Sequence, residues 1–168
     1  MADFSDFADM MSCSINNGGG CAVGVAWEKN SGCEVYVRNQ APFGVDTPIQ
    51  HGGRGIKPCP HELLLSAAGS CFIGTFQVFQ SQLRVEIVDI RTFVTGCLEL
   101  GTKGENEGKY DLSGIDLFVK VKVKGEDEFD KEIVGDILRM TKNHCPTTRA
   151  LAKACPINII SEIEMTPE

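Results

Sequence analysis

The chain has 168 residues, of which 42% are hydrophobic and 23% are charged, enough to bury one sizeable core. We therefore expect a single domain over residues 1–168. The formal charge of −7 argues against nucleic acid as a partner, because nucleic-acid binding depends on Lys and Arg at the phosphates. Residues 1–11 lack the basic start and the apolar run of a signal peptide, so we expect no export.

The first part of the chain predicts two short strands and a long loop. Residues 22–27 and 34–38 are expected to be strands. Residues 41–59 contain three prolines and four glycines, which break regular structure, so we expect a loop there. Long loops often carry function.

A helix is expected to begin at Pro60 and to run to about Gln82. Proline is well placed in a first helical turn, and Glu62 adds the negative charge that a helix N-terminus favours. Apolar residues occupy every face of this helix, which predicts a place at the centre of a core. Ser, Thr and Gln interrupt its apolar run, so we do not expect it to enter a membrane.

The last part of the chain alternates strands and helices. Its clearest strand lies at residues 115–123, where apolar and polar residues alternate as in a sheet with one exposed face. This order predicts an α+β fold, and the short connections indicate antiparallel sheets. The other expected elements are a strand or bent strand pair at 85–100, a hairpin connection at 101–111, an amphipathic helix at 127–143, a short helix at 146–154 and a strand at 157–165.

Eight cysteines without an export signal indicate a reducing compartment, so we expect a cytoplasmic protein with free thiols. Four of them, Cys13, Cys21, Cys33 and Cys97, are expected to be small buried hydrophobes.

Cys71 and Cys145 stand out by context. Cys71 lies in the middle of the apolar helix after a run of small residues, so it is either core filler or a shielded nucleophile. Cys145 precedes Pro146 at an expected helix start, where unpaired N–H groups can stabilise a thiolate. Position alone therefore favours a lowered pKa for Cys145, because burial by itself raises the pKa of a thiol such as Cys71.

Two sequence motifs surround these cysteines. Residues 60–71 read Pro-His-Glu-Leu-Leu-Leu-Ser-Ala-Ala-Gly-Ser-Cys, and residues 145–151 read Cys-Pro-Thr-Thr-Arg-Ala-Leu. They closely resemble the two cysteine motifs of the OsmC-like family, which includes the organic hydroperoxide resistance (Ohr) proteins. The resemblance extends from about Gly32 to the C-terminus, and residues 1–31 add little to it.

The resemblance implies an OsmC-like fold, with antiparallel sheets around two long central helices in an intertwined homodimer and active sites at the subunit interface. It also implies a thiol-dependent peroxidase that protects against oxidative stress. Cys71 would reduce an organic hydroperoxide and become a sulfenic acid, and Cys145 would condense with it to a disulfide. A dithiol reductant, lipoyl-type or thioredoxin, would then reset the pair, and no cofactor is implied.

Peroxidatic members of this family also carry a glutamate ten residues before the cysteine and an arginine upstream. Here His61 has that spacing and Glu62 lies nine residues before Cys71, and we take Glu62 as the candidate. In a continuous helix Glu62 would lie about 13 Å along the axis from Cys71, so it would have to serve the partner subunit. For the arginine we choose Arg54 over Arg38.

Three alternatives remain open. The chain offers zinc-binding residue types, but it has no Cys-x-x-Cys pair, so spacing argues against a metal site. Cys155 is an alternative disulfide partner for Cys145. An OsmC-fold module that binds a small ligand or senses redox state, without efficient peroxidase activity, is the main alternative function. The residues weighed for zinc are His51, Cys59, His61, Cys71, His144 and Cys145.

Overall fold

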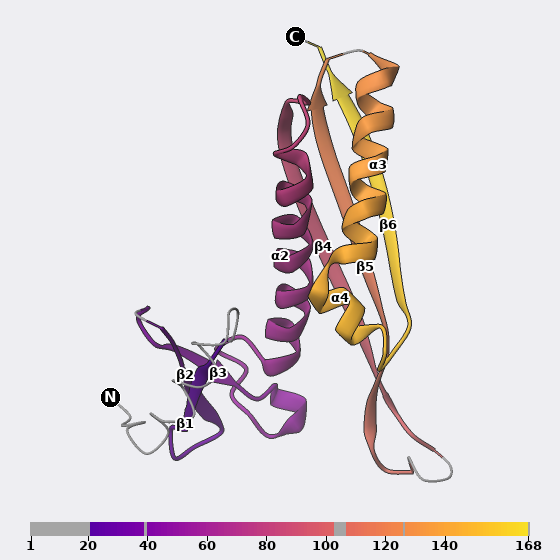
Figure 1. Cartoon of the computed structure of the whole chain (residues 1–168). Coiled ribbons are helices and arrows are strands. Elements are labelled where there is room, and N and C mark those ends of the chain that lie inside the picture. Colours follow the sequence, from indigo (N-terminus) through magenta and orange to yellow (C-terminus); the bar gives the residue numbers. More distant parts are fainter. Residues whose placement is uncertain (1–20, 39, 103–106, 126, 168) are drawn as a thin grey trace. The chain divides into compact units, whose positions relative to one another are not determined.

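The computed structural model describes residues 21–38, 40–102, 107–125 and 127–167, and Cys13 lies outside them. The chain divides into two units, Met1–Leu63 and Leu64–Glu168, each of which is described by itself. Figure 1 shows the elements along the chain.

The first unit contains an antiparallel sheet of three short strands in the order β1-β2-β3. The strands are β1 (Val23–Trp27), β2 (Gly32–Val37) and β3 (Phe43–Asp46), followed by the short 3₁₀ helix η2 (Ile49–His51). Strand β3 lies inside the segment for which we expected only loop. It was missed because four residues between two prolines are too few to show strand periodicity, although β2 pairs with them.

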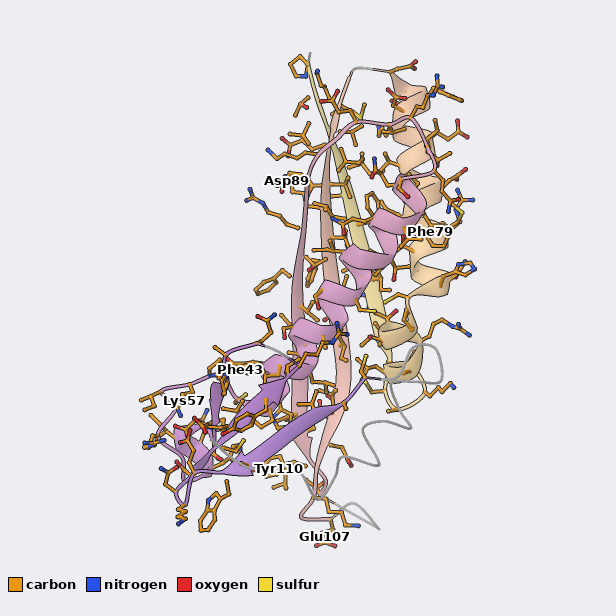
Figure 2. The ribbon with its side chains drawn as sticks, turned by 60° about the vertical axis from the view of Figure 1, so that its left-hand side comes forward. Phe43, Lys57, Phe79, Asp89, Glu107 and Tyr110 are labelled. Carbon is orange, nitrogen blue, oxygen red and sulfur yellow. The ribbon has the colours of Figure 1, made fainter. Side chains whose placement is uncertain are left out.

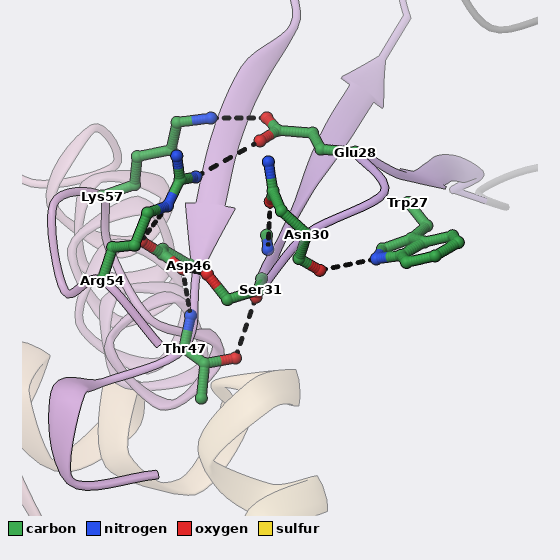
Figure 3. Close-up of polar contacts among 9 residues, drawn as sticks. Trp27, Glu28, Asn30, Ser31, Asp46, Thr47, Arg54 and Lys57 are labelled. Carbon is green, nitrogen blue, oxygen red and sulfur yellow. Dashed lines mark hydrogen bonds and ion pairs between the residues drawn. The ribbon is translucent and has the colours of Figure 1, made fainter. Parts of the chain in front are cut away.

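Polar contacts order the loop that follows β3 (Figure 3). The buried carboxylate of Asp46 accepts hydrogen bonds from the Ser31 hydroxyl and the Thr47 N–H, both at 2.8 Å. A Cβ atom at Gly53 would lie 1.7 Å from the Thr47 carbonyl oxygen, so this close approach requires glycine. The loop is therefore a defined structure, held by these side-chain contacts as well as by the short helix η2.

The second unit consists of three long strands and three helices. Its elements are α2 (Pro60–Gln80, which begins in the first unit), β4 (Ile87–Leu100), β5 (Tyr110–Lys124), α3 (Glu128–His144), α4 (Pro146–Leu151) and β6 (Ile157–Thr166). The sheet order is β4-β5-β6, and Figure 2 marks Glu107 and Tyr110 near the end of the β4–β5 hairpin.

The sheet of the second unit is mixed, which corrects the expectation of purely antiparallel sheets. Strands β4 and β5 are antiparallel, but β5 and β6 are parallel. The reason is the connection: α3 and α4 form a crossover that returns the chain to the same end of the sheet, as parallel strands require.

The core of this unit lies between the helices and one face of the sheet. The alternation expected for residues 115–123 is confirmed, because every second side chain from Ile115 to Val123 is at most 2% exposed. These side chains pack against apolar residues of α2 and α3. The inward β5 residues are Ile115, Leu117, Val119, Val121 and Val123.

Helix α2 is less buried than its all-round apolarity predicted. Only Ala68, Gly69, Phe72 and Phe76 are buried. Gly69 lets the helix approach β4 closely, since a Cβ there would lie 2.8 Å from Thr92 Oγ1. With a mean hydropathy of 1.4, α2 is long and apolar enough to cross a membrane by length and composition alone, a test that core helices of soluble proteins also pass.

Candidate functional site

Cys71 lies on α2 at the edge of the core. It is half-buried and packs against the buried cluster of the second unit. One turn further along the helix, the Thr75 hydroxyl donates to the Cys71 carbonyl oxygen at 2.9 Å. The thiol is therefore partly protected from solvent but still accessible, as a nucleophile for a small substrate needs to be.

Cys145 lies at the junction of α3 and α4, where it ends the first helix and caps the second. It is completely buried. Its N–H donates to the Thr141 carbonyl at 2.9 Å, and its own carbonyl accepts from the Arg149 N–H at 3.1 Å and the Thr148 hydroxyl at 3.3 Å. These bonds fix the backbone on both sides of the Cys145 thiol.

The structure brings the two cysteines together within the second unit. Burial raises the pKa of the Cys71 thiol, but hydrogen bonding by Thr147 and by the Cys145 thiol, with a further contribution from the nearby Thr75 side chain, lowers this pKa below its usual value. Cys71 thus combines a favoured thiolate with a second thiol in hydrogen-bonding contact. This arrangement can form and break a disulfide.

The donors that we expected to stabilise Cys145 are directed at Cys71 instead. Cys145 makes no side-chain capping bond to α4, and hydrogen bonding by Thr147, in the first turn of this helix, lowers the pKa of the Cys71 thiol on α2. The sequence showed these donors next to Cys145 but could not show which thiol they face, because that depends on how α2 packs against α4. Thr75 was missed altogether.

Glu62 is engaged at the start of its own helix. Its carboxylate accepts a hydrogen bond from the Cys59 N–H at 2.7 Å, which satisfies one of the unpaired donors of the first turn. Helix α2 is continuous from Pro60 to Gln80, the condition on which the expectation of a role in the partner subunit depends. His61, the alternative to Glu62, is exposed.

Arg54 lies in the first unit, where two carboxylates surround it (Figure 3). Its guanidinium is 3.6 Å from Asp46 and 3.6 Å from Glu28, and Lys57 also pairs with Glu28. These contacts give Arg54 a structural role in the loop. Of the four residues expected at the site, the structure joins Cys71 and Cys145.

A hollow of about 390 Å³ with mostly apolar walls lies along α3, and neither Cys71 nor Cys145 lines it. Phe79 packs edge-on against His144, with the ring centres 5.3 Å apart, on the side of α2 that faces α3 (Figure 2). Phe72 and Phe76 on the same helix are core residues with at most 1% exposure. The hollow is lined by Leu83, Ile133, Asp136, Arg139, Met140, Asn143 and His144.

The remaining cysteines divide differently from the expectation. Cys21 and Cys97 are exposed and Cys33 is half-buried, so the expectation of buried thiols is wrong for the first two. Cys97 lies on the exposed face of β4, in the same alternation as Phe93 and Thr95. Cys155 is buried. Among the described residues, no three His, Cys, Asp or Glu side chains group as metal ligands.

Comparisons with known proteins agree with the motifs. The model of the OsmC-like protein family matches residues 51–160. A search of curated proteins finds no match.

Solved structures share the fold at low sequence identity. An OsmC-like protein from Mycoplasma pneumoniae aligns with a TM-score of 0.69 and 17% identity, over 88% of this chain and 99% of its own. An organic hydroperoxide resistance protein OsmC from Legionella pneumophila gives 0.64 and 14%, over 86% and 98%. An organic hydroperoxide resistance protein from Elizabethkingia anophelis gives 0.67 and 15%, over 87% and 97%.

Proposed function

We propose a function from one premise: the chain belongs to the OsmC-like protein family. Membership suggests a redox or peroxide-resistance role, and two of the similar structures are organic hydroperoxide resistance proteins. We infer that this protein is a cysteine-based peroxidase that reduces organic hydroperoxides to alcohols. The observation that carries this proposal is the contact between Cys71, whose pKa is lowered, and the buried thiol of Cys145.

In the first step the Cys71 thiolate attacks the terminal oxygen of ROOH. A sulfur–oxygen bond forms, the O–O bond breaks, and Cys71 is oxidised to a sulfenic acid while the peroxide is reduced to RO⁻. The alkoxide needs a proton. The Cys145 thiol already donates a hydrogen bond to the Cys71 sulfur and can supply that proton, which leaves Cys145 as the thiolate for the next step.

In the second step the Cys145 thiolate attacks the Cys71 sulfenic acid. A disulfide forms and hydroxide leaves. The net reaction converts two thiols and ROOH into a disulfide, ROH and water. A dithiol reductant, lipoyl-type or thioredoxin, returns the two electrons by thiol–disulfide exchange. A reducing cytoplasm, where we place the protein, supplies such dithiols.

The hollow beside His144 favours organic over hydrogen peroxide. Its apolar walls come from Leu83, Ile133 and Met140, and each Å² of alkyl or aryl surface buried there contributes about 25 cal/mol. We propose that it receives the organic group of the hydroperoxide.

A homodimer completes the proposal. Helix α2 leaves a face of mostly small side chains exposed, which lets a second helix approach closely. A second copy would bury this apolar helix. This face consists of Ala67, Ser70, Gly74, Gln77 and Val78, all of which are exposed.

The dimer also gives Glu62 and Arg54 a place in the proposal, as supports of the Cys71 thiolate in the other subunit. A mixed dimer of Cys71→Ser and Glu62→Gln chains tests this for Glu62. Partial activity is expected, since one of its two sites then combines an intact Cys71 with an intact Glu62 across the interface. Activity no higher than that of the separate Glu62→Gln dimer would contradict action between subunits.

One experiment tests the peroxidase itself: intact mass and free-thiol count after one equivalent of cumene hydroperoxide. The parent protein should lose two thiols and about 2 Da. Cys145→Ser should accumulate a sulfenic acid that dimedone traps, and Cys71→Ser should show neither change. Slow oxidation that is indifferent to Cys71 would overturn the proposal.

The second candidate function is a small-ligand-binding or redox-sensing module. The apolar hollow and the engagement of Arg54 by two carboxylates favour it. Under this alternative Cys71 would react with bulky hydroperoxides no faster than free cysteine does, whereas the peroxidase should react far faster.

A further inference from the structure

The hollow along α3 contains a sulfur atom that the proposed reaction does not use. Met140 lines this hollow, whereas neither Cys71 nor Cys145 does, and Met140 is the one sulfur-bearing residue among those that line it. Its side chain is half-buried and packs against the core cluster of the second unit. A thioether has no proton to lose, so it is nucleophilic at any pH, and oxidants convert it to a sulfoxide.

The walls of this hollow suit an organic group. Leu83 and Ile133 supply apolar surface beside Met140, and a volume of about 390 Å³ is within the range of small-molecule sites. One end of the hollow is fixed by His144. Because a carbonyl oxygen only accepts, His144 Nδ1 donates the 2.8 Å hydrogen bond to the Met140 carbonyl, and the ring packs edge-on against Phe79.

We propose that Met140 is a second peroxide-reactive site of this protein and that it is selective for organic hydroperoxides. A hydroperoxide whose organic group occupies the hollow oxidises the Met140 thioether to a sulfoxide. The inference rests on the proposed function for the entry of organic hydroperoxides into this hollow, but Cys71 takes no part in the step. Hydrogen peroxide has no apolar group, so the walls of the hollow do not concentrate it beside Met140.

The step needs no other reactant. The thioether sulfur attacks the terminal oxygen of ROOH, a sulfur–oxygen bond forms and the O–O bond breaks. The proton of the terminal oxygen passes to the leaving alkoxide, which is released as ROH. Sulfur loses two electrons and the peroxide gains them. The product places a polar sulfoxide in an apolar wall, so oxidation should weaken the binding of the next organic group.

Met165 provides a matched control within the same unit. It lies on β6, is also half-buried and packs against the same core cluster, but it does not line the hollow. Exposure and packing alone therefore predict similar oxidation of the two methionines by any peroxide. A preference for Met140 that depends on the organic group would assign the difference to the hollow.

The test uses full-length Cys71→Ser, because the Cys71 thiol would otherwise consume the peroxide. The protein is treated with an excess of cumene hydroperoxide or of hydrogen peroxide, and peptide mass spectrometry follows the gain of about 16 Da at each methionine. The ratio of the Met140 rate to the Met165 rate should be about 3- to 10-fold higher with cumene hydroperoxide than with hydrogen peroxide. Equal ratios would overturn the inference.

A second variant tests the walls. Leu83 lines the hollow and is 39% exposed, so Leu83→Asn, added to Cys71→Ser, should fold. The ratio with cumene hydroperoxide should fall at least about twofold, and the ratio with hydrogen peroxide should stay the same. An unchanged ratio with cumene hydroperoxide would contradict binding in the hollow. If Cys71→Ser fails to fold, as judged by circular dichroism, the parent serves after excess peroxide has exhausted its reactive thiols.

The two proposals fail in different ways. Selective oxidation of Met140 in a protein without peroxidase activity leaves this inference standing and removes the proposed function. Peroxidase activity together with equal ratios for the two peroxides does the reverse.

Discussion

The two units use polar side chains in opposite ways. In the first unit, Arg54 and Lys57 lie against the carboxylates of Asp46 and Glu28, so the charges neutralise one another and hold a loop. In the second unit, neutral donors surround the Cys71 sulfur at the edge of an apolar core and favour its anionic form. Charges that compensate one another give structure, whereas an anion held only by neutral donors remains free to react.

The largest expected effect concerns Cys71, the reactive thiol of the second unit. Cys71→Ser should lower hydroperoxide reduction on the order of 10³-fold or more, because a hydroxyl at ordinary pKa is a poor nucleophile. Cys145→Ser should allow one turnover and then stop. Steady-state and single-turnover assays with cumene hydroperoxide measure both. Cys97→Ser is the matched control, since this thiol is exposed on β4, and its loss should leave activity unchanged.

A second prediction concerns the core beneath the site. Phe72 is completely buried one residue from Cys71. Phe72→Ala should lower the free energy of unfolding by about 3–5 kcal/mol through lost burial and a cavity. Urea titration followed by circular dichroism measures this change. In contrast, Phe93→Ala, at a ring that is 68% exposed, should change stability by less than about 1 kcal/mol. Equal losses for the two would contradict the assigned core.

The sequence predicted most of the second unit because its signals are local. The alternation along β5 and the apolar stripe of α3 follow from periodicity, and the structure confirms both. The parallel pairing of β6 could not be predicted in this way, because it depends on the path of a crossover. Strand β3 was missed since its pairing partner, not its own pattern, makes it a strand.

For the site, the motifs identified the two cysteines that the structure joins. They did not reveal that the Thr147 donors face Cys71, because the sequence does not show how α2 packs against α4. Nor did spacing show that Arg54 has two carboxylate partners, since Glu28 and Asp46 come from separate segments of the first unit. Contacts between distant segments were thus the part that local patterns could not supply.

The third prediction tests the structural role of the buried Asp46 carboxylate in the first unit. Burial raises the pKa of Asp46, but hydrogen bonds from the Ser31 hydroxyl and from the N–H groups of Thr47, Ile56 and Arg54 lower it overall. A carboxyl with a lowered pKa in the folded state stabilises the fold above its unfolded pKa of about 3.9, and this stability is lost as the pH falls through the folded value.

Asp46→Asn should therefore destabilise the first unit at neutral pH and flatten the dependence of its stability on pH below about 4. Hydrogen exchange of the β2 and β3 amides at several pH values measures both effects, and exchange in β5 serves as the internal control. An unchanged acid dependence in Asp46→Asn would show that another carboxyl is responsible.

The smallest expected effect on stability decides between two roles of Arg54. Its side chain is 45% exposed and its ion pairs are 3.6 Å long, so Arg54→Met should cost only about 0–1 kcal/mol. If Arg54 only neutralises Asp46 and Glu28, kcat/KM for cumene hydroperoxide should change little, as in the control Lys57→Met, which removes the other cation at Glu28. If Arg54 leaves its carboxylates to support the thiolate of a partner subunit, kcat/KM should fall at least about 100-fold while Lys57→Met stays active. Because both variants remove one charge from the same loop, a difference in activity at similar stability would assign Arg54 to the reaction.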